Sequence, residues 1–280
     1  MLKEKAYAKI NVFLDILGKR DDGYHNIETI MMPIDLYDTV SLSLQENPIV
    51  DLSTNIPITE KPEDNLVYKV AVHMIDKFKL KKGLKIHIDK RIPISAGLAG
   101  GSADAAATLR GINKLFNLKL QDQELAEIGE LFGSDIPHCI YNKPCIARGK
   151  GGQLMFLKKT CKWPVLIVTP KLQLSTKQIY ESVDMEKVKN VKITKMSNAI
   201  YNRNYTLFVR ELHNALEQFT FKLFPQVEAL KEVLLKENID GALMSGSGPS
   251  IIVFSEIKKN LQELIEKYQE ENNVILTKIN

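Results

Sequence analysis

Near the start of the chain apolar positions alternate with mainly polar ones, which is the period of a β-strand. One face of this strand carries only apolar side chains, those of Ala8, Ile10, Val12, Leu14 and Ile16. The other face carries Lys9, Asn11, Phe13 and Asp15. Glycine and aspartate at 18–23 predict a turn, and two further strands are predicted at 27–34 and 40–44.

Helical and strand patterns continue in mixed order along the chain. Apolar spacing predicts helices at 66–78, 102–116 and 123–132, and a strand around 86–88. After the glycine-rich residues 149–152 the pattern predicts a strand at 165–168, a polar stretch to about 204, helices at 207–219 and 226–236, strands on both sides of 245–249, a helix at 257–268 and a strand at 274–279. This order favours two α+β domains, at 1–152 and 153–280.

Composition narrows the class of protein. With 44% hydrophobic and 26% charged residues, the chain of 280 residues is typical of a folded globular protein. A net charge of +4 does not require a nucleic-acid partner, and no apolar run is long enough for a membrane helix. Three cysteines without CxxC spacing, and histidines without HxxxH spacing, argue against a disulfide framework or a zinc site. We therefore expect a cytoplasmic protein with no nucleic-acid or membrane partner.

The strongest candidate for chemistry is the glycine-rich segment 93–104, which precedes a predicted helix at Ser102. Glycines let backbone N–H groups approach a ligand closely, and a helix start adds unpaired N–H groups and a favourable dipole. Such a cluster suits phosphate. The alternative is a tight connector beneath an alanine-rich core helix. The P-loop pattern GxxxxGK[ST] is absent.

Two charged residues are candidates for catalysis. Asp135 precedes a short predicted helix, and its alternative role is to support the start of that helix through the helix dipole. Lys9 lies two residues before Asn11 on the same strand face, and the alternative is that this face is solvated.

The segment 20–25 ends in Gly23, Tyr24 and His25. A tyrosine and a histidine can stack on a nucleobase and bind its edge, although a polar turn explains the same residues. The basic residues between Lys77 and Arg91 alternate with apolar ones as on a solvated face, which disfavours a nucleic-acid patch.

Five segments together resemble the galactokinase, homoserine kinase, mevalonate kinase and phosphomevalonate kinase (GHMP) superfamily. These are residues 8–11, 22–25, 93–104, 133–135 and 245–250. The glycine loop identifies the superfamily, and Lys9 and Asn11 followed by Asp-Gly-Tyr-His resemble its branch that phosphorylates 4-diphosphocytidyl-2-C-methyl-D-erythritol. The resemblance covers about 6–254 and is weakest at 182–205.

This resemblance implies a two-domain GHMP kinase fold. The N-terminal domain would be like domain 2 of ribosomal protein S5, the C-terminal domain ferredoxin-like, and the active site would lie in the cleft between them. It also implies transfer of a phosphoryl group from ATP to the C2 hydroxyl of the cytidine-diphosphate substrate, in the non-mevalonate route of isoprenoid biosynthesis. A sister kinase acting on homoserine, mevalonate or a sugar is the nearest alternative, and a non-catalytic RNA-binding module is an alternative of another class.

The resemblance also implies roles for individual residues. Asp135 would accept the hydroxyl proton, and Lys9 would hold or polarise that hydroxyl. The substrate would contact Asn11, Tyr24, His25, Gly246, Ser247 and Gly248. ATP would contact Asn65, Lys90, Pro93, Ile94, Ser95, Ala96, Gly97, Leu98, Ala99, Gly100, Gly101, Ser102 and Ala103.

The sequence departs from the superfamily at the metal site. The usual Gly-Leu-Gly-Ser-Ser-Ala-Ala is Gly-Leu-Ala-Gly-Gly-Ser-Ala at 97–103, so glycines replace the two serines, one of which often helps to hold Mg²⁺. Ser102 and Asp104 are the candidate ligands. Gly152 replaces a commonly acidic residue. We expect a monomer or a weak homodimer.

Overall fold

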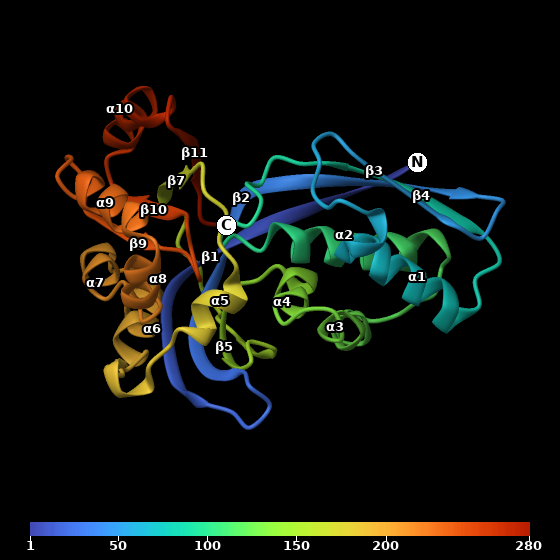
Figure 1. Cartoon of the computed structure of the whole chain (residues 1–280), viewed down its shortest axis with the longest axis horizontal. Coiled ribbons are helices and arrows are strands. Elements are labelled where there is room, and N and C mark those ends of the chain that lie inside the picture. Colours follow the sequence, from blue (N-terminus) through green and yellow to red (C-terminus); the bar gives the residue numbers. More distant parts are fainter. The chain divides into compact units, whose positions relative to one another are not determined.

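The computed structural model describes residues 1–280, which form two compact units (Figure 1). The first unit consists of residues 1–8, 36–94 and 99–142, and the second of residues 9–35, 95–98 and 143–280. Strands β1 (Leu2–Lys19) and β2 (His25–Gln45) each begin in one unit and end in the other. The domain boundary predicted after Gly152 lies within the second unit.

The first unit is a sheet covered by helices. Its strands follow the order β3-β4-β2-β1, and β4 runs parallel to β3 and antiparallel to β2. The elements that complete this unit are β3 (Val50–Thr54), η1 (Pro62–Asp64), α1 (Leu66–Phe78), β4 (Gly83–Asp89), α2 (Gly100–Leu115), α3 (Asp122–Glu130) and α4 (Ile136–Tyr141).

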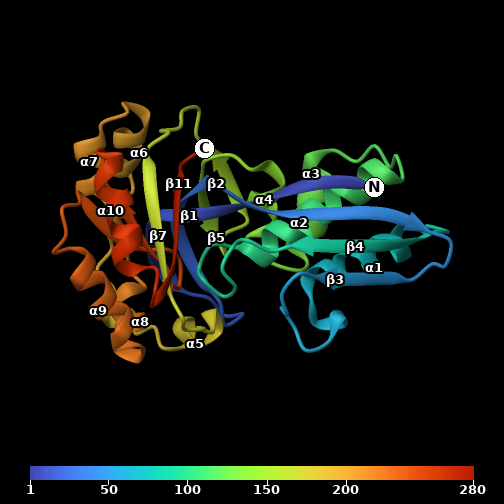
Figure 2. The same cartoon turned by 90° about the horizontal axis from the view of Figure 1, so that it is seen from above.

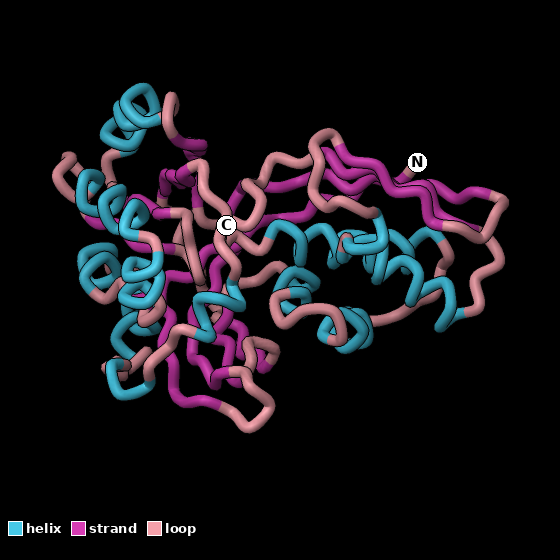
Figure 3. The backbone as a smooth tube through the Cα atoms, in the orientation of Figure 1, coloured by secondary structure: helices cyan, strands magenta, loops and turns pink.

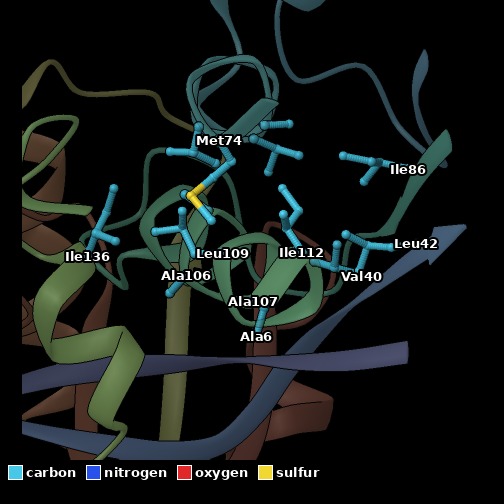
Figure 4. Close-up of a cluster of buried hydrophobic side chains, with 14 of the residues drawn as sticks. Ala6, Val40, Leu42, Met74, Ile86, Ala106, Ala107, Leu109, Ile112 and Ile136 are labelled. Carbon is cyan, nitrogen blue, oxygen red and sulfur yellow. The ribbon is translucent and has the colours of Figure 1, made fainter. Parts of the chain in front are cut away.

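The core of the first unit lies between α1, α2 and the sheet (Figure 4). Met74 from α1 and Ile112 from α2 lie in one fully buried cluster with Leu42 of β2. An alanine-rich helix can approach its neighbours closely, and at Gly111 an added Cβ would lie only 2.6 Å from Leu42 Cδ1. This close packing fixes the position of α2, whose first residues belong to the glycine-rich segment.

The second unit contains an antiparallel sheet of order β11-β7-β10-β9. Helix α10 lies along β7 and β11 (Figure 2). The elements of this unit are β5 (Cys145–Gly149), β6 (Gln153–Phe156), β7 (Pro164–Pro170), α5 (Thr176–Glu181), η2 (Met185–Lys187), α6 (Thr194–Tyr201), α7 (Tyr205–Arg210), β8 (His213–Asn214), α8 (Glu217–Leu223), α9 (Pro225–Leu234), β9 (Gly241–Met244), β10 (Ile251–Phe254), α10 (Lys258–Tyr268) and β11 (Asn272–Lys278).

Three sequence predictions about elements were wrong. The strands predicted at 27–34 and 40–44 are one strand, β2, which continues without a break through residues 35–39. The helix predicted at 207–219 is interrupted by β8, which pairs in parallel with Phe13 and Leu14 of β1. The polar stretch before 204 contains the short helices α5 and α6 (Figure 3). Strands β3, β5 and β6 were not predicted.

None of the helices combines the length and the hydrophobicity that crossing a bilayer requires.

Candidate active site

Lys9 and Asn11 form one buried hydrogen-bonded pair on β1. Lys9 Nζ donates to Asn11 Oδ1 over 2.7 Å, and Asn11 Nδ2 donates to Thr29 Oγ1 over 2.8 Å. The exposed fractions of Lys9 and Asn11 are 5% and 4%. The alternative that this strand face is solvated is therefore wrong. Burying an ammonium group costs free energy unless the group is paired. Lys9 therefore does not serve to make the surface soluble, and it remains a candidate for catalysis.

Residues 95–98 of the glycine-rich segment touch a second glycine loop, residues 245–248, within the second unit. Ser245 Oγ donates to Gly97 O over 3.0 Å, and Lys9 N donates to Leu98 O over 3.1 Å. Gly97 has a φ of +74°, and a Cβ there would lie 2.1 Å from Ser245 O. Only glycine fits such a contact. The structure thus brings together Lys9, the loop at 95–98 and the loop at 245–248.

The loop at 245–248 is held from several sides. Ser247 Oγ lies 2.9 Å from Thr176 Oγ1, and a Cβ at Gly246 would lie 3.3 Å from Asn11 Oδ1. Asn214, at the end of β8, donates to the carbonyl oxygens of Met244 and Gly246 over 2.7 and 2.8 Å. Gly246 therefore lies beside Asn11, and Asn214, which the sequence did not single out, fixes the backbone of this loop.

Tyr24 and His25 have opposite environments. Tyr24 is 61% exposed, and the ammonium of Lys150 lies 4.9 Å from the centre of its ring. His25 is 6% exposed, and neither of its ring nitrogens has a hydrogen-bond partner. Burial, assisted by the charge of Lys19, lowers the pKa of His25. An uncharged imidazole with both nitrogens unpaired is costly to bury, which indicates a polar ligand at this position.

Tyr180, near the end of α5, lies beside His25, with 5.6 Å between the ring centres. Sequence reasoning missed this residue because it lies in a polar stretch far along the chain from His25. The only signal there is the pair Ile179 and Tyr180, two apolar residues among polar ones. Two aromatic rings and one unpaired imidazole are a suitable set of groups for a flat heteroaromatic ligand.

In the first unit, helix α2 begins at Gly100, two residues earlier than predicted. Its N-cap residue, Ala99, is left-handed with a φ of 57° and provides no side-chain cap. The first N–H groups of the helix consequently have no partner within the helix, and they can bind an anion. A Cβ at Gly100 would lie 3.2 Å from Lys90 Nζ and 3.1 Å from Ile92 Cγ2, so the helix start packs tightly on the end of β4.

Lys90 is buried between two carboxylates. Its ammonium bonds to Asp38, and to Asp104 over 2.7 Å. Burial opposes the charge of Lys90, but Asp104 and Asp38 outweigh it and raise the pKa of Lys90. Burial raises the pKa of Asp104, whose carboxylate shares the site with that of Asp38. The backbone N–H and carbonyl of Lys90 both bind the side chain of Asn55.

These contacts give Lys90 a supporting role at the start of α2, and its direct contact with adenosine stays a prediction. Asn65 is the N-cap of α1, where its Oδ1 accepts from Val67 N over 2.9 Å. Its contact with a nucleotide likewise stays a prediction.

Asp135 occupies the N-cap position of α4, but its side chain makes no capping hydrogen bond. The alternative that Asp135 supports the start of α4 through the helix dipole needs no such bond and stays open. The segment that leads to Asp135 lies next to the first turn of α2, because a Cβ at Gly133 would lie 3.9 Å from Ser102 Oγ. Gly133, two residues before Asp135, thus lies beside the first turn of α2.

No group of three or more His, Cys, Asp or Glu side chains in the chain is placed to hold a metal ion. Of the two candidate ligands, Asp104 is 2% exposed and is bound to Lys90. An ammonium group already compensates this carboxylate, so it fits poorly as a Mg²⁺ ligand. Ser102 stands in the first turn of α2 and fits better.

The chain matches two protein-family models. The model of the GHMP kinases N terminal domain matches residues 65–143, and the model of the GHMP kinases C terminal matches residues 196–274. The first match contains Lys90, the whole glycine-rich segment and Asp135, and the second contains the loop at 245–248.

Relatives with similar sequences carry one name. A Staphylococcus aureus (strain MRSA252) protein called "Putative 4-diphosphocytidyl-2-C-methyl-D-erythritol kinase" is 44% identical over 254 residues, 90% of this chain and 89% of that protein. The 4-diphosphocytidyl-2-C-methyl-D-erythritol kinase of Brevibacillus brevis is 42% identical over 256 residues, 91% of this chain and 87% of the relative.

Solved structures agree on the fold. A crystal structure of 4-(cytidine 5'-diphospho)-2C-methyl-D-erythritol kinase superposes with a TM-score of 0.84 at 26% identity, covering 100% of this chain and 99% of that one. A crystal structure of "L. major mevalonate kinase in complex with R-mevalonate" superposes with a TM-score of 0.77 at 17% identity, covering 100% of this chain and 96% of that one. At this identity the likeness shows only that the fold is shared. The predicted two-domain GHMP kinase fold is confirmed, and the chain belongs to the 4-diphosphocytidyl-2-C-methyl-D-erythritol kinase family of the GHMP kinases.

Proposed function

We infer that the chain transfers the γ-phosphoryl group of ATP to the C2 hydroxyl of 4-diphosphocytidyl-2-C-methyl-D-erythritol, giving the 2-phosphate and ADP. The observation that supports this substrate is the buried imidazole of His25, whose ring nitrogens have no hydrogen-bond partner. His25 follows Tyr24 in the sequence, and its ring lies beside that of Tyr180. The acceptor of a kinase for homoserine, mevalonate or a sugar carries no nucleobase, so such an enzyme binds only the adenine of ATP. An RNA-binding module has no use for a buried, paired lysine at Lys9.

The neutral imidazole of His25 suits the edge of cytosine. One ring nitrogen donates a proton and the other accepts one, so His25 can pair with a group of either kind. Tyr24 is exposed and is therefore free to lie flat on the base. Residues 246–248, fixed by Asn214, would contact the remainder of the substrate.

The phosphates of ATP would bind the residues 93–103, with the N-terminus of α2 and its unpaired N–H groups at their centre. A helix N-terminus contributes only about 0.3–2 kcal/mol, whereas micromolar to millimolar affinity for a nucleotide requires roughly 4–8 kcal/mol. The loop amides, Asn65 and contacts to the base must supply the difference.

In the transfer itself, the C2 oxygen forms a bond to the γ-phosphorus while the bond from that phosphorus to the β–γ bridging oxygen breaks. The hydroxyl proton passes to a carboxylate oxygen of Asp135. Lys9, oriented by Asn11, would bind and polarise the C2 oxygen. Phosphoryl transfer passes through a loose transition state, which requires positioning and neutralisation of charge rather than covalent chemistry by the protein.

Mg²⁺ would neutralise the charge on the β- and γ-phosphates. In this chain Ser102 is the side chain that fits it, and the absence of a cluster of acidic ligands is in keeping with an ion held mainly by phosphate oxygens and water. We further propose that the protein acts in the cytoplasm as a monomer or a weak homodimer, which light scattering at two protein concentrations would test.

The test of the function is a product assay with matched acceptors. The purified chain is incubated with ATP, Mg²⁺ and either the cytidine-diphosphate substrate, homoserine or mevalonate, and the products are identified by mass and by phosphorus NMR. Phosphorylation of the first acceptor alone, at C2, supports the proposal. Turnover of another acceptor at a higher kcat/KM, or binding of RNA without ATP turnover, would overturn it.

A further inference from the structure

Beyond Lys9 and Asn11, the hydrogen-bonded chain on β1 continues through a residue that has no role so far. The hydroxyl of Thr29, on β2, donates to the carbonyl oxygen of Phe13 over 2.6 Å. The same hydroxyl accepts from Asn11 Nδ2 over 2.8 Å. A hydroxyl has a single proton. Because that proton goes to the Phe13 carbonyl, Thr29 can only accept from Asn11.

This polarity determines which way the Asn11 carboxamide faces. With Nδ2 directed at Thr29, Oδ1 is the atom left for Lys9, whose ammonium donates to it over 2.7 Å. The reversed carboxamide would turn its NH₂ group toward the ammonium and its oxygen toward the lone pairs of Thr29, which replaces two attractive contacts by two repulsive ones. Thr29 therefore sets the orientation of the group that holds Lys9.

Thr29 itself is held rigidly. It is 1% exposed, and it lies in the middle of the stretch of β2 that pairs with β5, opposite Ala147. At such a buried position, neither a water molecule nor another rotamer can easily replace the hydrogen bonds of the Thr29 hydroxyl. The chain Phe13–Thr29–Asn11–Lys9 thus runs from fixed backbone to an ammonium group, with each donor and acceptor determined by the one before.

We propose that Thr29 is a positioning residue for phosphoryl transfer, which acts through the orientation of Asn11 on the ammonium of Lys9. The proposal rests on the proposed function, in which Lys9 polarises the C2 hydroxyl. Thr29 touches neither substrate nor ATP in this scheme. Its loss should therefore lower kcat and leave the KM for ATP almost unchanged.

The experiment compares Thr29→Val, which keeps the shape of the side chain, with Thr29→Ser, which keeps the hydroxyl. For Thr29→Val we expect kcat to fall about 10- to 150-fold, the range for losing a hydrogen bond that serves a charged group, with the KM for ATP within about threefold. Thr29→Ser should restore kcat to within about fivefold of wild type. Thr29→Ala, which places no methyl group against the Phe13 carbonyl, serves if the valine variant does not fold.

The matched control is Thr108→Val in α2. Thr108 is fully buried and its hydroxyl likewise donates to a carbonyl, that of Asp104, over 2.8 Å. This variant should lose a similar amount of thermal stability and keep kcat within about threefold. If both valine variants lose kcat in proportion to their stability, Thr29 has a general structural role and the proposal fails.

A double-mutant cycle with Asn11→Ala tests whether Thr29 acts on kcat through Asn11 or independently of it. Once Asn11 is absent, Thr29 has nothing to orient, so Thr29→Val in that background should lower kcat less than about twofold further. A full second loss would overturn the proposal. Failure of the proposed function is a different result, since the folded wild-type protein would then leave the cytidine-diphosphate substrate unphosphorylated.

Discussion

The ammonium of Lys9 donates to Oδ1 of Asn11, two residues further along the same strand, over 2.7 Å. Alternate residues of a strand lie on the same face, so the pair is a direct consequence of the β-period. Both side chains are buried. A cation in this position has a fixed direction, and that is the property needed to stabilise charge developing on a reacting oxygen.

Replacing Lys9 by methionine should therefore lower kcat about 10²- to 10³-fold, the loss typical of removing one preorganised electrostatic contact. The unbranched methionine keeps much of the buried volume but leaves Oδ1 of Asn11 without its donor, so the variant should fold with a moderately lower melting temperature. The same substitution at Lys3, an exposed lysine on β1, is the control and should leave kcat unchanged. Equal kcat values for the two variants would contradict the role of Lys9.

Asp135 is expected to accept the proton from the C2 hydroxyl. Asp135→Asn should lower kcat about 10²- to 10⁴-fold, with the affinity for ATP nearly intact. Asparagine has nearly the same size and shape as aspartate, so the variant should fold, and its melting temperature is measured beside kcat.

The control for Asp135 is Asp122→Asn, which alters an exposed carboxylate in the first turn of α3. Steady-state kinetics of both variants with saturating ATP are the measurement. A kcat for Asp135→Asn within threefold of wild type would remove Asp135 from the chemistry.

Tyr24 is expected to stack on the cytosine of the substrate. Tyr24→Ala should raise the KM for that substrate about 5- to 150-fold, since stacking of one base on an aromatic ring contributes about 1–3 kcal/mol. The KM for ATP and the melting temperature should not change, because the ring is 61% exposed. Tyr24→Phe should retain most of the affinity.

Tyr201 offers a matched control for Tyr24. Its ring is 56% exposed, and a lysine ammonium, that of Lys159, lies 4.2 Å from its centre. Tyr201→Ala should leave both KM values at the wild-type level. If Tyr24 affected KM only through its contact with a lysine, Tyr24→Ala and Tyr201→Ala would change KM alike.

Local patterns predicted the elements that local forces determine. Helix α1 covers the predicted 66–78 because its apolar spacing, the Asn65 cap and the left-handed Lys79 at its end all lie within the segment. The strands around the loop at 245–249 were predicted for the same reason. The sequence also predicted that glycines in this segment allow a close backbone contact. At Gly97 such a contact leaves no room for a side chain.

Residues whose partners are distant in the chain could not be predicted in this way. Asp38 gives no local sign that it binds Lys90, and Asn214 was placed inside a helix although it ends a short strand beside β1. Thr29 was one residue of a predicted strand, and its role depends on Phe13 and Asn11 from another strand. Tertiary contacts override local propensity at all these positions.

Acidification should affect the protein through His25. Burial lowers the pKa of His25 in the folded chain, whereas in the unfolded chain the imidazole titrates near its usual value of about 6.5. Below that value His25 binds a proton in the unfolded chain but stays uncharged in the folded chain. The free energy of unfolding should therefore fall as the pH is lowered from 7 through the unfolded pKa, until His25 of the folded chain is protonated as well.

Urea denaturation between pH 8 and pH 5 measures this effect. One proton can change the free energy of unfolding by at most about 1.4 kcal/mol per pH unit, and His25→Gln should remove the His25 part of the slope. Above pH 7 the two proteins carry the same charge at this position, so their difference in stability should be constant there. The KM of the wild-type protein for the cytidine substrate should also rise on acidification, because a protonated imidazole has lost its acceptor nitrogen. If the difference in stability between wild type and His25→Gln does not vary between pH 7 and pH 5, the imidazole is not held neutral by burial.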